Sequence, residues 1–416
     1  MTPPVPTGST RLPPRELDPS LPDLAAVLDP AEVARRLQRH WPGPGSPPSI
    51  SDCAVEHVQW SPGVECRVTC RLTLSPAVDG PASTVVVVVA TPMGVRDRLY
   101  TSDPELPGLV AATDPAVMRG WFSERLERPV EACSVTPVSY RPASRCVLRY
   151  RLSGGSSTAA YGKLLGGDGF EALASTARSL GDDLAPLLVG VAPDWRLVVQ
   201  GDAGDRSLAA IAAEPPSPGT LAQLRSGGRL LCRLHRSGGP RGWRRSLVDD
   251  IDGLHDHLPA VRCVSPSVAE LMSAGIDRLA RLPAAAGRPA PGHGAFRLDQ
   301  VHLSVRGPVL IDLDSFCWAE PARDVANLLA YLRWRELRRP EAAAAVTAIR
   351  AAFLAGYADE AAAPLDADRL RVFEAAALLK IAGRRCRRLA VAEWGLLGDL
   401  VSAALDLLGA AAGRRS

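Results

Sequence analysis

Several features are absent from this sequence, and each absence narrows the class of protein. No run approaches about 18 consecutive apolar residues, so we expect no membrane span. The N-terminus, MTPPVPTGSTRLPPREL, lacks the apolar segment of a secretory signal peptide. The nine cysteines are odd in number and none forms Cys-x-x-Cys, which argues against a zinc site and a disulfide framework. A reduced, cytoplasmic protein is the simplest interpretation.

The sequence also lacks a strong charge of either sign. Its 48 Lys and Arg residues nearly balance 45 Asp and Glu residues. A general nucleic-acid binder would be clearly basic, so we expect no nucleic-acid partner. At 416 residues the chain is long enough for two or three domains, each with its own hydrophobic core.

Chemically active residues gather in the stretch His293–Asp324, which reads HGAFRLDQVHLSVRGPVLIDLDSFCWAEPARD. The apolar run PVLI at 308–311 predicts a strand that ends at Asp312 and Asp314. Carboxylates at a strand end are a common way to hold Mg²⁺, which prefers oxygen ligands and binds one or two carboxylates together with phosphates. A polar loop beside an acidic strand end therefore suggests a phosphoryl-transfer centre.

This stretch resembles the catalytic core of the aminoglycoside phosphotransferase and choline kinase family, which shares the protein-kinase fold. The family's loop reads His-Gly-Asp, four further residues and Asn; its metal strand reads Ile-Asp and precedes Asp-Pro-x-x-Asp-Leu-Ala. The chain departs from this pattern where the family has its catalytic Asp, here Ala295, and its metal-binding Asn, here Gln300. It matches the pattern at His293, Gly294, Ile311, Asp312, Pro321, Asp324 and Ala326.

The resemblance implies roles for the residues around the predicted strand. Asp312 would hold the metal, and Asp314 would be a second ligand or a structural partner. Gln300 would offer its carbonyl oxygen to the metal or form a hydrogen bond within the loop. His293 would brace the loop rather than act as a general base. Asp324 would hydrogen-bond the loop backbone or cap its helix, since Asp is favoured at an N-cap.

The absence of the catalytic Asp at Ala295 leaves two interpretations open. In the first, Asp299 replaces it as the general base, because it lies one residue before Gln300 in the same loop. General-base assistance is typically worth about 10²–10⁴-fold, so its loss alone need not abolish transfer that depends on positioning and a metal. In the second, the protein is a pseudokinase that keeps nucleotide binding or only the fold.

The segment upstream carries the residues expected to bind the nucleotide. A strand-like run at 159–165 contains Lys163, and a helix-like run, FEALASTARSL, contains Glu171. In kinase-like folds a strand Lys contacts the phosphates and pairs with a helix Glu, so the resemblance implies these roles here. A solvated lysine at a strand edge is the alternative. The run WRLVVQGD, with Gln200 and Asp202 near its end, resembles the hinge that holds a nucleobase through its backbone.

An internal repeat precedes and overlaps this segment. DPSLPDLAAVLDPA at 18–31 matches DPELPGLVAATDPA at 103–116 in nine of fourteen positions. VEHVQWSPGVECRVTCRL at 55–72 then aligns with VTPVSYRPASRCVLRYRL at 135–152, with a Trp in one copy facing a Tyr in the other. Repeats reveal architecture, and each copy reads helix, hairpin, strand. The first copy has Val and Ala where Lys163 would fall, so we expect it to bind no nucleotide.

These observations predict an α+β, bilobal protein-kinase-like fold with an additional duplicated half-lobe at the N-terminus. The small lobe would be rich in β-strands and the large lobe mostly helical, because the C-terminal third is Ala/Leu-rich with helical period. The expected divisions are a disordered, Pro-rich tail at 1–17, a degenerate repeat at 18–102, a kinase-like N-lobe at 103–202 and a helical C-lobe at 203–416.

Two charged clusters in the C-lobe bear on the acceptor. The basic run GRRCRRL around Arg384 and Arg388 would either attract phosphate or an acidic peptide, or form the solvated face of a helix. An acidic cluster would suit a cationic acceptor or merely improve solubility; it comprises Asp249, Asp250, Asp252 and Asp256.

The most favoured function is transfer of phosphate from ATP, with Mg²⁺, to a hydroxyl group. The acceptor would be a small molecule, such as an aminoglycoside-like or other natural product, or a Ser or Thr of a biosynthetic peptide. The alternative is a catalytically silent pseudokinase that serves as a nucleotide-binding or partner subunit of a biosynthetic complex. The additional N-terminal unit favours an extended acceptor or a partner protein over a small sugar.

Overall fold

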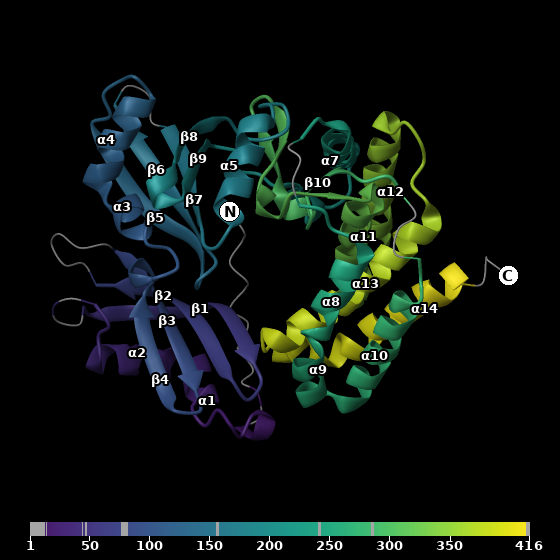
Figure 1. Ribbon diagram of the computed structural model, residues 1–416, viewed down its shortest axis with the longest axis horizontal. Helices are drawn as coiled ribbons and strands as arrows, with labels where there is room; N and C mark the ends of the chain where they lie inside the picture. Colours follow the sequence, from purple (N-terminus) through teal and green to yellow (C-terminus); the bar gives the residue numbers. More distant parts are fainter. Residues whose placement is uncertain are drawn as a thin grey trace.

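The computed structural model describes residues 13, 15–43, 45, 48–75, 82–154, 158–239, 243–283 and 287–412. Two units that each contain a β-sheet lie one above the other, and a predominantly helical lobe lies beside both (Figure 1). The β-rich N-terminal part and the helical C-terminal part are those predicted from the sequence. Of the expected disordered tail, Arg15–Leu17 form a 3-10 helix, and residues 1–12 and 14 lie outside the described residues.

The N-terminal unit contains two short helices and a four-stranded antiparallel sheet. Asp29 caps the second helix by accepting the N–H of Ala31 at 2.8 Å, as an N-cap Asp commonly does. The helices are α1 (Leu24–Leu28) and α2 (Pro30–Arg39), and the strands, in sheet order, are β1 (Ile50–Ser61), β2 (Glu65–Leu74), β3 (Ser83–Thr91) and β4 (Gly94–Leu99).

The second unit contains a five-stranded sheet with three helices. Its strand order places β7 between β6 and β9, so that the strand carrying Lys163 is central. The helices are α3 (Leu109–Thr113), α4 (Pro115–Arg125) and α5 (Gly169–Ser179), and the strands, in sheet order, are β5 (Ala132–Arg141), β6 (Arg145–Ser153), β7 (Thr158–Leu165), β9 (Leu197–Gly201) and β8 (Leu188–Ala192). Short 3-10 helices lie at Tyr100–Ser102 and Pro193–Trp195.

The valine run of β3 explains how the two units hold together. Val86 and Val88 are buried in a core that the N-terminal unit shares with the helical lobe. Val85 and Val87, on the opposite face of the strand, are buried in the core of the second unit. A strand that is apolar on both faces is expected to be covered on both faces, and here it separates two hydrophobic cores.

The repeat seen in the sequence has a counterpart in individual hydrogen bonds. In the N-terminal unit, the buried Asp18 carboxylate accepts the indole N–H of Trp60 and a backbone N–H of the hairpin turn, both at 2.9 Å. In the second unit, the buried Asp103 carboxylate accepts the hydroxyl of Tyr140 at 2.5 Å and the hairpin N–H of Ala143 at 2.8 Å. Each carboxylate therefore ties the entry segment of its unit to its first hairpin. The divisions at 102 and 202 stay predictions.

The helical lobe is built around two hydrophobic clusters. One surrounds α7, α11 and α12, and the other joins α8–α10, α13 and α14 to the N-terminal unit. The helices of this lobe are α6 (Leu208–Ala212), α7 (Pro218–Arg236), α8 (Leu247–His255), α9 (Leu258–Val264), α10 (Pro266–Ala280), α11 (Pro321–Arg338), α12 (Ala343–Glu360), α13 (Ala367–Arg387) and α14 (Leu397–Ala412).

Short strands and turns carry the central loop of this lobe. Two antiparallel strand pairs, β10 with β13 and β11 with β12, hold the stretch His293–Asp324. The strands are β10 (Ala290–Gly292), β11 (Val301–Ser304), β12 (Gly307–Leu310) and β13 (Cys317–Ala319), with 3-10 helices η4 (Leu298–Gln300), η5 (Leu313–Ser315), η6 (Pro340–Ala342) and η7 (Val391–Leu396).

Within the described residues, one helical stretch, Val391–Ala411, is long and apolar enough to cross a membrane when only length and composition are considered. Its buried side chains, Leu400, Val401, Ala404 and Leu408, belong to the core shared by α10, α13 and α14. The helix therefore has a packing role in the lobe, and a core helix meets the same criteria.

We predict that Asp103→Ala destabilises the protein by about 2–3 kcal/mol, because it removes the acceptor of the buried Tyr140 hydroxyl and of the partly buried Ala143 N–H. Urea unfolding monitored by tryptophan fluorescence measures this change. Glu105→Ala, at an exposed position two residues away, is the matched control and should change the unfolding free energy by less than about 0.5 kcal/mol. Equal changes in unfolding free energy for the two substitutions would contradict a stabilising role of the Asp103 hydrogen bonds.

Candidate functional site

A buried aspartate holds the central loop in shape. Asp324, at the start of α11, accepts the backbone N–H of His293 at 2.6 Å and that of Gly294 at 2.9 Å. Gly294 has φ +83°, and a Cβ there would lie 1.9 Å from the carbonyl oxygen of Ser315. The loop therefore requires glycine at this position, and Asp324 hydrogen-bonds the loop backbone as the resemblance implied.

Two histidines complete this brace. His293 is fully buried and its Nε2 lies 2.9 Å from the carbonyl oxygen of Ile311, which ties the loop to the end of the strand before Asp312. Nε2 of His235 lies 3.3 Å from Asp324, and its Nδ1 lies 2.8 Å from the hydroxyl of Tyr357. Burial would raise the pKa of Asp324, but the hydrogen bond and charge of His235 lower that pKa to about 2.

The strand end brings two carboxylates to the sheet of the second unit. The Nζ atom of Lys163 lies 2.5 Å from Oδ1 of Asp312 and 3.1 Å from Oδ1 of Asp314. Asp312 has a left-handed backbone, with φ +65°, which turns the chain sharply as it leaves β12. Lys163 and Asp312, the residues that the resemblance linked to the phosphates and the metal, are therefore in direct contact.

Arg145 joins the same cluster and was missed in the sequence. It begins β6, directly after the hairpin turn, and its Nη1 atom lies 2.9 Å from Oδ1 of Asp312 and also pairs with Asp314. Burial would raise the pKa of Asp312, but the charges of Lys163 and Arg145 hold it well below its usual range. No local pattern in β6 pointed to this contact, since Arg145 and Asp312 are 167 positions apart in the chain.

The other nucleotide-binding candidates lie outside this cluster. Glu171 is exposed in the first turn of α5, and the expected Lys163–Glu171 ion pair is not formed, because the lysine pairs with the two aspartates instead. The side chain of Gln200 donates to the carbonyl oxygen of Pro186 at 3.2 Å. Asp202 is exposed and accepts the backbone N–H of a residue two positions on, at 3.0 Å.

The loop residues next to the missing catalytic Asp are held by local contacts. Oε1 of Gln300 accepts the backbone N–H of Arg297 at 2.8 Å, and its Nε2 lies 3.5 Å from Asp312. The hydrogen bond within the loop, left open in the sequence, therefore occupies the oxygen that was a candidate metal ligand. Oδ2 of Asp299 lies 3.1 Å from Nη2 of Arg297, and its Oδ1 is buried without a hydrogen-bond partner.

The carboxylates of Asp312 and Asp314 suit an oxygen-preferring divalent cation. Both contact Nη1 of Arg145, so their oxygens already face one positively charged point. Mg²⁺ commonly takes only one or two protein carboxylates and completes its shell with phosphates and water. Across the described residues no group of three or more His, Cys, Asp or Glu side chains gathers in a metal-binding arrangement.

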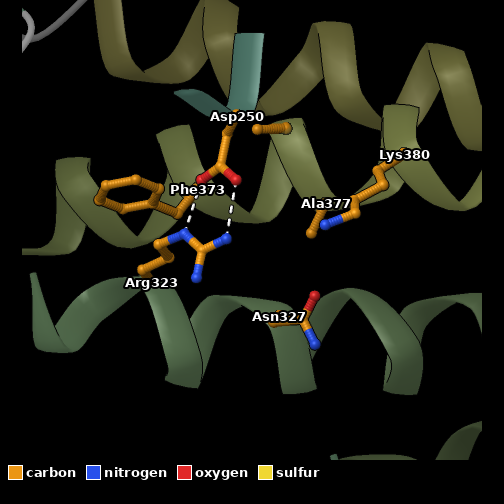
Figure 2. Close-up of a pocket in the computed structure, with 7 residues that line it drawn as sticks. Asp250, Arg323, Asn327, Phe373, Ala377 and Lys380 are labelled. Carbon is orange, nitrogen blue, oxygen red and sulfur yellow. Dashed lines mark hydrogen bonds and ion pairs between the residues drawn. The ribbon is translucent and has the colours of Figure 1, made fainter. Parts of the chain in front are cut away.

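The predicted acidic cluster does not form an acidic cleft. Asp250 forms a two-pronged ion pair with Arg323, with both N–O distances 2.7 Å, and lies 3.5 Å from Arg245. Figure 2 shows this pair beside Lys380 in a pocket between α11 and α13. The remaining members, Asp249, Asp252 and Asp256, are exposed.

A segment of the chain, residues 184–371, matches the model of the phosphotransferase enzyme family. This match confirms the resemblance to aminoglycoside phosphotransferases and choline kinases that the sequence suggested. The match spans the loop, the strand end and α11, so these elements form the core of a protein-kinase-like fold. A search of the curated proteins gave no match.

Solved structures with a similar chain course include several small-molecule kinases. The choline kinase of Streptococcus pneumoniae is 15% identical, with 71% of this chain and 98% of that chain covered and a TM-score of 0.48. A choline/ethanolamine kinase family protein of Mesorhizobium loti is 17% identical, with 73% and 93% covered and a TM-score of 0.45. An amicoumacin kinase complex with AMP-PNP and Ca²⁺ is 17% identical, with 65% and 88% covered and a TM-score of 0.47.

We predict that Asp324→Asn destabilises the protein by about 2–3 kcal/mol at pH 7, because the neutral amide is a weaker acceptor and one of its ends is a donor. The folded-state pKa of Asp324, about 2, lies below its unfolded value, so the carboxylate stabilises the fold above about pH 4. That contribution is lost as pH falls toward 2. In denaturant titrations from pH 7 to pH 3, the difference in unfolding free energy between wild type and Asp324→Asn should therefore become smaller.

The matched control is Asp256→Asn, at an exposed position in the same lobe. It should leave the unfolding free energy within about 0.5 kcal/mol of wild type across the pH range. A difference in unfolding free energy between wild type and Asp324→Asn that stays constant from pH 7 to pH 3 would contradict a stabilising role of the ionised Asp324 carboxylate.

Proposed function

We propose that this protein is an ATP- and Mg²⁺-dependent phosphotransferase that acts on a hydroxyl group. The observation that carries the proposal is the convergence of Lys163, from the β-rich lobe, on Asp312 and Asp314, from the helical lobe. A strand lysine and a strand-end aspartate in one cleft are the two groups that phosphoryl transfer needs for a triphosphate and its metal. The phosphotransferase family match to residues 184–371 supports the same reaction class.

The charges of the cleft suggest how a nucleotide would be held. Lys163 and Arg145 now neutralise the two aspartates. Triphosphate oxygens would offer these cations an alternative partner, which would free Asp312 and Asp314 to bind Mg²⁺. A metal bound there would neutralise charge on the phosphates during transfer. Lys163 and Arg145 would then orient the triphosphate through charge-assisted hydrogen bonds, the strong class of such bonds.

The general base is the second part of the proposal. Ala295 cannot accept a proton, and Asp299 is the nearest carboxylate in the same loop along the chain. Its unpartnered Oδ1 atom leaves one oxygen with a free lone pair, while Arg297 holds the other. We assign Asp299 the role of accepting the proton of the acceptor hydroxyl, and His293 and Asp324 the role of holding the loop.

A catalytically silent, nucleotide-binding subunit is the second candidate. Two observations favour it: Ala295 replaces the usual base, and two fixed cations already balance the charges of Asp312 and Asp314. Under this alternative the N-terminal unit would bind a partner protein of a biosynthetic complex. Nucleotide binding without measurable ATP turnover in the wild type would favour it over the enzyme.

We expect wild-type protein to bind AMP-PNP more tightly with Mg²⁺ than without it in calorimetric titrations. Asp312→Ala should remove this dependence on Mg²⁺, because it removes a carboxylate ligand. Lys163→Ala should weaken binding at least about tenfold in either condition, because a charge-assisted contact to the phosphates is lost. Glu124→Ala, at an exposed position on α4, is the control and should bind as wild type. Unchanged binding in both site variants would contradict the proposed site.

Asp299→Asn should lower the rate of ATP turnover by about 10²–10⁴-fold if Asp299 is the general base. Nucleotide affinity should stay unchanged, since the proton transfer does not contribute to nucleotide binding. ADP release is measured with a panel of hydroxyl acceptors, and AMP-PNP titrations serve as the control for binding. Equal turnover in wild type and Asp299→Asn would assign the proton to another group.

A further inference from the structure

A small pocket lies behind the central loop, between α8, α11 and α13. Its lining includes the Asp250–Arg323 ion pair and the side chain of Lys380 (Figure 2). Arg323 also donates to the carbonyl oxygen of Gly294 at 2.7 Å, so the pocket lies directly against the segment that carries Ala295. At about 20 Å³ the pocket has room for about one water molecule, so it marks the position of Lys380 beside the loop and does not itself hold an acceptor.

One face of α13 is basic from this pocket onward. Lys380 and Arg384 lie four residues apart on one side of α13, and Arg388, four residues further on, is the C-cap residue at the end of this helix. Over the ranges that the structure describes, none of the three forms an ion pair with an acidic side chain. Asp250, the acid nearest to Lys380 in the pocket, already carries a two-pronged bond to Arg323.

Arg141, at the end of β5, adds positive charge beside the basic face of α13. It forms no ion pair in the described part of the chain, and the charge of Arg384 acts on it, as its own charge acts on Arg388. His57 lies on β1, the strand of the N-terminal sheet that contacts α13, but burial, and then the charge of Arg388, lowers its pKa to about 3, so it adds no charge. Figure 1 shows both β-rich units facing the helical lobe.

Lys380, Arg384 and Arg388 are half-buried, and the charges of neighbouring arginines act on Lys380 and Arg388. Burial, then the charges of Arg385, Arg384 and Arg141, lowers the pKa of Arg388 to about 10. Burial, then the charge of Arg384, lowers the pKa of Lys380 to about 7. Half-buried cations without partners oppose folding unless an anion compensates them.

We propose that Lys380, Arg384 and Arg388, with Arg141 opposite, bind an anionic group of the acceptor, a phosphate or a carboxylate. The acceptor would then be an anionic hydroxy compound rather than a cationic aminoglycoside. This inference rests on the proposed phosphotransferase function for its description of the ligand as an acceptor. The anion site itself is separate from Lys163, which pairs with Asp312 and Asp314.

The test measures anion binding to the full chain without nucleotide, at about pH 6, where Lys380 is charged. Thermal unfolding and calorimetry are carried out with inorganic phosphate and citrate as anionic probes, glucose as a neutral probe and kanamycin as a cationic probe. Phosphate and citrate should raise the unfolding temperature, whereas glucose and kanamycin should not. Stabilisation by kanamycin in place of the anions would overturn the proposal.

Variants locate the binding site on the protein. Lys380→Met and Arg384→Met should each weaken citrate binding at least about tenfold, and Arg384→Lys should restore part of it, because the charge is retained. Arg119→Met, an exposed arginine on α4, should bind citrate as wild type. Loss of citrate binding in Lys163→Ala, with normal binding in the α13 variants, would place the anion at the nucleotide site and overturn the proposal.

The two proposals fail in different ways. If AMP-PNP does not bind but citrate binding depends on Arg384, the phosphotransferase function fails and the anion site on α13 remains. If AMP-PNP binds with Mg²⁺ and no anionic probe binds, the anion site fails and the phosphotransferase function remains. Removal of like-charge repulsion should leave the α13 variants folded, and their unfolding temperatures without ligand check this directly.

Discussion

The ion cluster of Lys163, Arg145, Asp312 and Asp314 is the contact on which the arrangement of the cleft depends. It joins two adjacent strands of the second sheet to the end of β12 in the helical lobe, through contacts of 2.5–3.1 Å and the Arg145–Asp314 pair. Opposite charges in a partly buried setting attract more strongly than at an exposed surface. The same cluster therefore joins the two lobes and, in the proposed function, would supply the charges that bind a nucleotide and its metal.

The ion cluster can join the two lobes because the central loop next to it has a fixed backbone. Asp324 and His293 fix the loop backbone and tie it to Ile311, one residue before Asp312. Few alternatives exist for such a loop, since Gly294 leaves no room for a Cβ. This explains why the motif could be identified from the sequence: short-range geometry restricts the residue types at these positions. Lys163 was found for a related reason, because it lies on a central strand of a recognisable unit.

Other parts of the site depend on long-range packing, which short motifs do not record. Arg145 meets Asp312 across 167 positions of the chain, and no local pattern in β6 announces that contact. Glu171 had the right order and spacing for a pair with Lys163, yet the aspartates take the lysine and Glu171 stays exposed. The sequence left two roles open for the acidic run near Asp250, and the long-range ion pair of Asp250 with Arg323, from another helix, could not be foreseen from that run.

The duplicated N-terminal unit links these findings. Its β3 valines cover one face of the second unit, and its β1 contacts α13, so the unit packs against the helix that carries Lys380 and Arg384. Its His57, on β1, adds no positive charge there, because burial, and then the charges of Arg388 and Arg141, lowers the pKa of His57 to about 3. The N-terminal unit therefore leaves the charges of Arg384, Arg388 and Arg141 uncompensated, and the proposed anion of the acceptor would compensate them.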